Sequence, residues 1–296
     1  MTTDASINPS LHSQEGYCSV DYGKLWYRYY QSTSSNTAPL TIIILHGGPG
    51  CPSDYLFELA DLSRDFNVVF YDQLGCGRSS HDVPAEVLNV KQFSKDLQQL
   101  IEHLNLDRFV LLGQSFGGFL ALHHQKNQTA KAEKLILASP LVCTNDWQQD
   151  AQLLIGQLDQ IYQDGLAQPI DSEAYKQAEA HFYQRYFCKL EPWPDLLNAT
   201  MDNLSTDVYE TMWGPNEFTS TGNLRNADCT GVLTDLSCPI LFICGSQDEA
   251  RPSTLQKYAN LCKHGYLEVL IDGTHCVHLE QPYEFMNKVS EFIKRS

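Results

Sequence analysis

No stretch of this 296-residue chain approaches the roughly 18 to 20 consecutive apolar residues that a membrane-spanning helix requires. The segment MTTDASINPSLHSQEG at positions 1–16 is polar, and it lacks the basic and apolar regions of a secretory signal. We therefore expect a cytoplasmic protein that has no membrane partner.

Basic side chains are scarce. Twenty lysine and arginine residues stand against thirty-six aspartate and glutamate residues, which gives a formal net charge of -16. A surface with this charge repels the phosphates of nucleic acids and of anionic membranes, so neither is an expected partner. It attracts cationic ligands, but only weakly at physiological salt.

Metal-binding and dithiol motifs are also missing. The ten cysteines are scattered singly, without a C-x-x-C pair, and this favours a reducing compartment. The glycine-rich segments HGGPG (46–50) and GCG (75–77) match neither G-x-x-x-x-G-K-[ST] nor G-x-G-x-x-G. We therefore expect no metal, no nucleotide and no organic cofactor.

Short apolar runs alternate with stretches of helical periodicity. The alternating segment 17–30 predicts a hairpin at a sheet edge. The apolar runs predict strands buried on both faces, as in a parallel sheet, at 41–45, 67–72, 109–113, 135–140, 239–245 and 266–272. Apolar spacing of three and four residues predicts helices within 93–104, 117–126 and 285–293. This order predicts a doubly wound, mostly parallel sheet with helices on both faces.

The alternation stops between residues 141 and 235, where the chain becomes helical, polar and rich in tyrosine and tryptophan. Loops at the functional edge of such sheets tolerate large insertions, and active-site covers are often built there. We expect a helical lid over 141–235, inserted into a core formed by residues 1–140 and 236–296.

The segment GQSFG (113–117) carries the strongest chemical signal in the chain. It follows a buried strand and precedes a helix, which is the setting of the G-x-S-x-G nucleophile elbow. Glycines flank the serine because side chains there would collide with neighbouring elements. The pattern predicts an α/β-hydrolase fold with Ser115 as its nucleophile.

A serine hydroxyl needs a base, and in this fold the acid and the histidine follow the serine in that order. Asp248 lies three residues beyond the strand at 239–245, where the acid is expected. Two histidines compete for the role of base. We favour His275, which lies in a loop after the strand at 266–272, over His278, which we place at or inside the last helix.

An acyl-transfer site also needs two N–H donors for the oxyanion. We expect the backbone N–H of Phe116 to be one donor and that of Gly48, in HGGPG, to be the other. His46 is expected to brace that loop. Asp72 is expected to tie down the loop QLGCGRS rather than act as the catalytic acid.

Taken together, HGGPG, DQLGCGRS, GQSFGG, GSQDE and GTH resemble the motifs of the proline iminopeptidase family of α/β hydrolases, from about Leu40 to the C-terminus. The segment MWGPNEF (212–218) is similar to the branch that contains the tricorn-interacting aminopeptidase. Two residues depart from the family pattern: Leu74 stands where many proline iminopeptidases have arginine, and Phe116 stands where the strict proline-specific members have tryptophan.

By this resemblance, Glu217 and Glu249 would bind the free α-amino group of the substrate. A desolvated carboxylate pair recognises an ammonium group by charge-assisted hydrogen bonds, and it rejects blocked N-termini. The resemblance implies a serine aminopeptidase that releases proline or another apolar residue from short peptides or aminoacyl substrates.

Two alternatives remain at this level. An esterase or amino acid amidase on the same scaffold would use the same serine, and an ordinary esterase would not require the two glutamates. A non-catalytic binding protein is opposed by the intact serine, aspartate and histidine set. For an enzyme, we expect activity to rise as His275 loses its proton, near the unperturbed pKa of about 6.5 unless the site shifts it.

Overall fold

The structure is a computed structural model, and it describes residues 11–34 and 39–295. Most of the polar N-terminal segment that suggested a cytoplasmic protein, residues 1–10, lies outside the described residues. Within the described part of the chain, no helix is both long enough and apolar enough to cross a bilayer.

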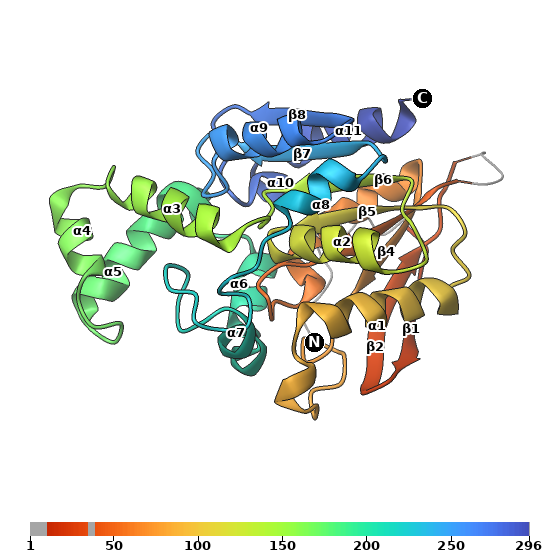
Figure 1. Cartoon of the computed structure of the whole chain (residues 1–296), viewed down its shortest axis with the longest axis horizontal. Helices are drawn as coiled ribbons and strands as arrows, with labels where there is room; N and C mark the ends of the chain where they lie inside the picture. The colour runs from red at the N-terminus through yellow and green to blue at the C-terminus, as the bar shows by residue number, and fades with distance from the viewer. Residues whose placement is uncertain (1–10, 35–38, 296) are drawn as a thin grey trace.

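An eight-stranded sheet forms the centre of this described part (Figure 1). Its spatial order is β1-β2-β4-β3-β5-β6-β7-β8. The pairs β1–β2 and β2–β4 are antiparallel and every other pair is parallel, as the sequence predicts. The strands are β1 Ser13–Val20, β2 Gly23–Tyr30, β3 Thr41–Leu45, β4 Asn67–Tyr71, β5 Phe109–Gln114, β6 Lys134–Ala138, β7 Ile240–Gly245 and β8 Gly265–Leu270.

The central strands of the sheet are buried on both sides, so apolar side chains point to both faces of the sheet. In β3, Ile43 and Leu45 point to one face, whereas Ile42 and Ile44 point to the other. The first face is covered by α1 Val90–His103, α2 Phe116–Asn127, α8 Thr230–Asp235 and α9 Pro252–Leu261. The second is covered by the 3-10 helix η1 Ser53–Arg64, α10 Val277–Glu280 and α11 Pro282–Lys294. A short 3-10 turn, η2 Ala85–Val87, precedes α1.

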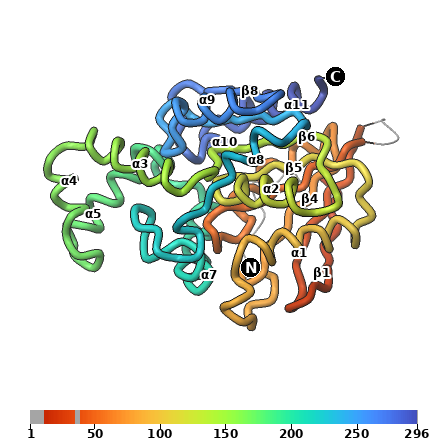
Figure 2. The backbone as a smooth tube through the Cα atoms, in the orientation of Figure 1, coloured from red at the N-terminus to blue at the C-terminus, as the bar shows by residue number. Residues whose placement is uncertain are grey.

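The segment between β6 and β7 is helical, and much of it projects to one side of the sheet, drawn green to teal in Figures 1 and 2. It contains α3 Thr144–Ile155, α4 Gln160–Leu166, α5 Glu173–Phe182, the π-helical turn η3 Tyr183–Phe187, α6 Asp195–Asp202 and α7 Thr206–Met212, and it ends with α8. Its outer part has its own apolar cluster, with Phe182 at the centre. Helix α8 packs on α2 and α9. The division at residues 140 and 236 therefore stays a prediction.

The carboxyl ends of the parallel strands meet at one edge of the sheet, where ligands bind in such folds. The segments that carry the sequence-predicted site residues follow β3, β5, β7 and β8 at this edge. The helical segment adds Glu217 from the chain after α7.

Candidate active site

Ser115 stands at the turn between β5 and α2, where the backbone is forced into an unusual conformation. Its φ is 54°, in the left-handed region that few residues other than glycine adopt. A Cβ on Gly113 would overlap the carbonyl group of Gly117, and a Cβ on Gly117 would overlap the carbonyl oxygen of Leu45. The glycines therefore permit the tight turn that holds Ser115 at the edge of the sheet.

Asp248 lies in the loop after β7 and is 1% exposed. Its Oδ1 accepts a hydrogen bond from the N–H of Ala250 at 2.8 Å. Its Oδ2 accepts from the N–H of Gly245 at 3.3 Å and from the hydroxyl of Ser139 at 2.5 Å. The carboxylate is therefore oriented from both sides.

His275 meets this carboxylate directly, because its Nδ1 lies 3.0 Å from Oδ1 of Asp248. Its ring stacks on Phe187, with centroids 5.5 Å apart, and meets Trp147 edge-on at 5.7 Å. Its backbone N–H donates to the carbonyl oxygen of Tyr186 at 2.9 Å. The inserted helical segment therefore contacts the imidazole through two aromatic rings and the backbone of His275 through one carbonyl oxygen.

The competing residue His278 lies in α10, just before the last helix, and it makes different contacts. Its ring packs against Tyr55 and Phe285, with centroids 5.6 and 6.1 Å away. Burial lowers the pKa of His278 to about 3, so it stays neutral over the physiological range. It does not line the cavity that contains Ser115 and His275.

The two expected oxyanion donors flank Ser115. The N–H of Gly47 donates to the hydroxyl of Tyr55 at 2.8 Å, and that hydroxyl donates to Oε1 of Gln114 at 2.5 Å. Gly48, with a φ of 105°, borders the cavity next to Ser115. Phe116 is the first residue of α2, so its N–H has no carbonyl one turn earlier in the helix to bond.

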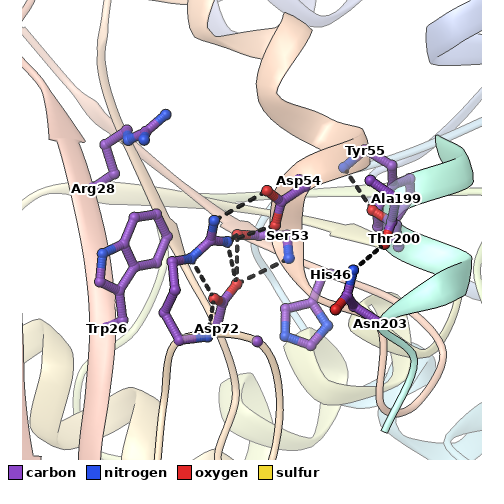
Figure 3. A network of polar contacts seen from close by, with 12 residues as sticks. Trp26, Arg28, His46, Ser53, Asp54, Tyr55, Asp72, Ala199, Thr200 and Asn203 are labelled. Carbon is purple, nitrogen blue, oxygen red and sulfur yellow. Dashed lines mark hydrogen bonds and ion pairs between the residues drawn. The ribbon is translucent and has the colours of Figure 1, made fainter. Parts of the chain in front are cut away.

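A buried ionic network braces the loop after β4, and part of it is labelled in Figure 3. The carboxylate of Asp72 accepts from the backbone N–H of Ser53 and Arg78 at 2.9 Å each, and from Nε of Arg78 at 2.8 Å. The guanidinium of Arg78 also bonds Asp54 and lies over the ring of Trp26, 3.8 Å from its centroid. Asp72 thus ties this loop to η1, as expected.

His46 braces the neighbouring loop. Its Nε2 accepts from the backbone N–H of Gln73 at 2.9 Å, and the side-chain amide of Gln73 donates to the carbonyl oxygen of His46 at 2.9 Å. The two glycine-rich loops are therefore joined by a reciprocal pair of hydrogen bonds. This is the supporting contact that the sequence predicts for His46.

A cavity of about 280 Å³ opens in front of Ser115 and His275. Both sequence-predicted glutamates, Glu217 and Glu249, line it. A small recess adjoins it, walled by Ser115, Gly48, Phe116, Leu141, Trp147, Trp213 and Glu217. Six of the seven residues proposed from the sequence therefore line the cavity or its recess. The seventh, Asp248, lies behind His275 and contacts it.

Glu249 is buried and Glu217 is half-buried, and the two carboxylates have different surroundings. Glu217 accepts from Nε1 of Trp147 at 2.9 Å and from the hydroxyl of Tyr209 at 3.3 Å. Burial raises the pKa of Glu217 to about 6, although these donors oppose the shift. Oε1 of Glu249 lies 3.5 Å from Nδ1 of His275, and burial raises the pKa of Glu249 well above its usual range.

The pKa of His275 departs from the sequence-based expectation. Burial lowers it, but Glu249, Asp248 and Glu217 outweigh this effect and raise it to about 9. The unperturbed value of about 6.5 therefore does not describe the free site. The pKa is raised because these three carboxylates surround one imidazole.

Three residues of the site were not predicted from the sequence. Ser139 bonds Asp248, Trp147 bonds Glu217, and Phe187 stacks on His275. Only Ser139 had a local signal, because it lies near the carboxyl end of the strand predicted at 135–140, which neighbours β5 in the sheet. Among the described residues, no group of three histidine, cysteine or acidic side chains is arranged to hold a metal ion.

Comparison with known proteins places these features in a family. The family model described as alpha/beta hydrolase fold matches residues 41–282. A proline iminopeptidase of Heyndrickxia coagulans is 32% identical, over 94% of this chain and 98% of its own length. One of Saccharolobus solfataricus is 30% identical, over 96% of this chain and 93% of its own length.

Solved structures agree with the sequence relatives. The crystal structure of proline iminopeptidase from Mycobacterium smegmatis superimposes with a TM-score of 0.89 at 30% identity, over 94% of this chain and 97% of that one. An esterase from Exiguobacterium antarcticum matches with a TM-score of 0.70 at 19% identity, over 95% of this chain and all of that one. The second likeness shows the fold alone.

Proposed function

Because the chain belongs to the proline iminopeptidase family of α/β hydrolases, we propose that it is a serine aminopeptidase with Ser115, Asp248 and His275 as its catalytic triad. The observation that carries the proposal is the cavity in which Ser115 and His275 face Glu217 and Glu249. It combines an acyl-transfer site with a receptor for an ammonium group. The substrates are short peptides or aminoacyl compounds that have a free N-terminus.

The reaction begins at the serine. The contact between Nδ1 of His275 and Asp248 leaves Nε2 free to take the proton from Oγ of Ser115. The serine oxygen attacks the first carbonyl carbon, and the N–H groups of Gly48 and Phe116 stabilise the oxyanion that forms. When the tetrahedral intermediate collapses, His275 gives its proton to the leaving amine. An aminoacyl ester of Ser115 remains.

Water completes the cycle by the same steps. His275 takes a proton from water, the hydroxide attacks the ester carbonyl, and the serine oxygen leaves with the proton that His275 returns. The released amino acid carries the new carboxyl group. These steps use only side chains and backbone groups of this chain.

Specificity for the N-terminus comes from Glu217 and Glu249. Neither carboxylate has a lysine or arginine beside it among the described residues that line the cavity. An ammonium group would bring a positive charge to both carboxylates, whereas an acetylated amine would displace water from them without bringing that charge. The adjoining recess has a volume of only about 10 Å³, and its walls include Leu141, Trp147 and Trp213, so it favours a small apolar group over a charged one.

The first test is hydrolysis of aminoacyl-naphthylamides of proline, alanine, leucine and phenylalanine, each with a free and an acetylated amine. We expect cleavage of the free-amine substrates only, and its loss in Ser115→Ala. Equal cleavage of acetylated substrates would overturn the roles of Glu217 and Glu249. Cleavage of neutral esters alone would favour the esterase alternative, which does not explain two glutamates in the cavity that contains the serine.

The cellular location is part of the proposal. All ten cysteines are unpaired in the structure, which supports the prediction of a reducing compartment such as the cytoplasm. Fractionation of source cells, with detection of the protein in the soluble cytoplasmic fraction, would test it.

A further inference from the structure

Nδ1 of His275 faces two carboxylates, although a catalytic triad requires only one. Oδ1 of Asp248 lies 3.0 Å away, and Oε1 of Glu249 lies 3.5 Å away. Asp248 is held by Ser139 and by the backbone of its own loop, so it is fixed in its triad position. Glu249 lines the open cavity instead, where a ligand can reach it.

In the free enzyme, the imidazolium of His275 is the cation available to Glu249. The described residues that line the cavity include Glu179, Glu210, Glu217 and Glu249 but no lysine or arginine. The pairing is reciprocal, since a charged His275 lowers the pKa of Glu249 and a charged Glu249 raises that of His275. Each group therefore stabilises the ionised form of the other, although burial is the larger effect on Glu249 and keeps its pKa above the usual range.

Groups on the other elements around His275 do not reverse the preference for a protonated imidazole. The rings of Trp147 and Phe187 are uncharged, and Glu217 adds negative charge from the helical segment. His278 in α10 is kept neutral by its burial and by the charge of His275. The surroundings thus favour an imidazolium, which is the form that cannot accept a proton from Ser115.

Building on the proposed aminopeptidase function, we propose that Glu249 has a second role as a switch on the general base. In the free enzyme its carboxylate pairs with His275 and keeps the imidazole protonated. The substrate's ammonium group then binds between Glu217 and Glu249, replaces the imidazolium as their counter-ion and releases His275 as a neutral base. Amine recognition and activation of the nucleophile become one event.

This coupling rejects wrong substrates twice. A peptide with a blocked N-terminus loses its contacts with the carboxylates, and it also meets an enzyme whose base is still protonated. Because Glu249, Asp248 and Glu217 raise the pKa of His275 above neutrality, most enzyme molecules would hold a protonated base at pH 7 before the substrate binds. The coupling between the two binding events is reciprocal. Because protonation of His275 opposes binding of the ammonium group, binding of the ammonium group must release a proton from His275.

The decisive experiment compares Glu249→Gln with the wild type on p-nitrophenyl acetate, which has no amine. We expect the acid limb of the pH profile of kcat/KM to move down by at least one pH unit in the variant. Ester hydrolysis at pH 7 should then rise about tenfold, while the plateau at high pH stays the same. Hydrolysis of alanine naphthylamide should fall in the same variant, because its ammonium group loses a partner.

Glu210→Gln is the matched control, because Glu210 is an exposed glutamate that lines the same cavity. It should leave the ester profile where it is in the wild type. An unchanged acid limb in Glu249→Gln would overturn the switch, even if aminopeptidase activity were lost. Conversely, if the wild type cleaved no free-amine substrate, the proposed function would fail while the ester profiles still decided the pairing.

A measurement that leaves Glu249 in place covers the case in which the variant fails to fold. In Ser115→Ala, the low-field Nδ1 proton of His275 can be followed by NMR across pH, with and without pyrrolidine. This aliphatic amine stays protonated over the range used. We expect saturating pyrrolidine to lower the titration midpoint of His275 by at least one pH unit. An unmoved midpoint would refute the proposal.

Discussion

At the scale of single residues, Ser139 is an unusual support for the site. Its φ of 47° places it in the left-handed region, which costs a residue with a Cβ about 1 kcal/mol. Its hydroxyl donates to Oδ2 of Asp248 and lies 3.2 Å from the carbonyl oxygen of His275. The strained backbone thus places one hydroxyl between two members of the proposed triad.

Ser139→Ala should lower kcat by about tenfold, because a hydrogen bond to a charged group contributes about 1.5 to 3 kcal/mol. KM for a free-amine substrate should change little, since Glu217 and Glu249 are untouched. Steady-state kinetics on alanine naphthylamide would measure both. Ser63→Ala is the control, because that buried hydroxyl has no hydrogen-bond partner among the described residues. A rise in KM alone would contradict the positioning role.

Most of the residues predicted for the site were identified from local sequence motifs. Ser115, Asp248 and His275 each follow a recognisable strand, so their chain positions place them at one edge of the sheet. The 3.5 Å contact between Glu249 and His275 lies outside the reach of such patterns, because it depends on side-chain conformation in a folded loop. The raised pKa of His275 follows from Glu249, Asp248 and Glu217 together, so it could not be read from the sequence either.

At the scale of elements, helix α3 contacts both a residue proposed to bind the substrate amine and the proposed general base. Its residue Trp147 donates from Nε1 to Glu217, and the edge of its ring meets His275. The sequence indicated a helical, aromatic insertion, but periodicity could not show which aromatic residue turns toward the serine. That choice is made by tertiary packing between segments about 70 and 130 residues apart.

Trp147→Phe separates the two contacts, because phenylalanine keeps an aromatic edge and loses the N–H. We expect KM for alanine naphthylamide to rise about tenfold, the effect of losing a hydrogen bond to a charged group. Hydrolysis of p-nitrophenyl acetate should change less than twofold. Trp193→Phe is the matched control, since its Nε1 bonds a backbone carbonyl, that of Cys188. Equal losses on both substrates would mean that Trp147 acts mainly through His275.

The loop after β4 provides a stability prediction. Burial raises the pKa of Asp72, but Arg78 outweighs it and holds the pKa below its usual value. A depressed pKa contributes stability above the unfolded value of about 3.9, and this contribution is lost as pH falls through the folded value.

Arg78→Met should therefore lower the free energy of unfolding at pH 7 by about 3 kcal/mol, because it leaves a buried carboxylate without its partner. Acid unfolding should begin at a higher pH than in the wild type. Urea titrations followed by circular dichroism would measure both effects. Arg64→Met, which breaks an exposed pair with Asp61, should cost less than about 1 kcal/mol. Equal losses in the two variants would contradict the account of Asp72.

At the scale of the whole molecule, the net charge of -16 surrounds a cavity that is itself lined by carboxylates. Such a field draws a cationic substrate toward the site, and dissolved salt screens it. Raising ionic strength from about 0.01 to 0.3 M should therefore lower kcat/KM for alanine naphthylamide about twofold. The same salt series with neutral p-nitrophenyl acetate should be flat. Parallel declines would show that salt acts on the catalytic step.

The overall architecture was the most predictable level, since buried strands, amphipathic helices and glycine turns all have local signatures. The arrangement of the helical insertion was the least predictable, because its helices pack through scattered aromatic side chains rather than a regular repeat. Some of its contacts with the catalytic loop involve backbone atoms, which leave no trace in residue identity.

Those backbone contacts bear on any attempt to exchange lids between relatives. The carbonyl groups of Tyr186 and Phe187 accept hydrogen bonds from the N–H groups of His275 and Cys276. A graft that replaced the whole insertion would remove these two hydrogen bonds to the catalytic loop together with the residues that line the cavity. A chimaera that retains 183–188 and varies the outer helices α4 and α5 should keep its chemistry while acquiring a new preference for substrates.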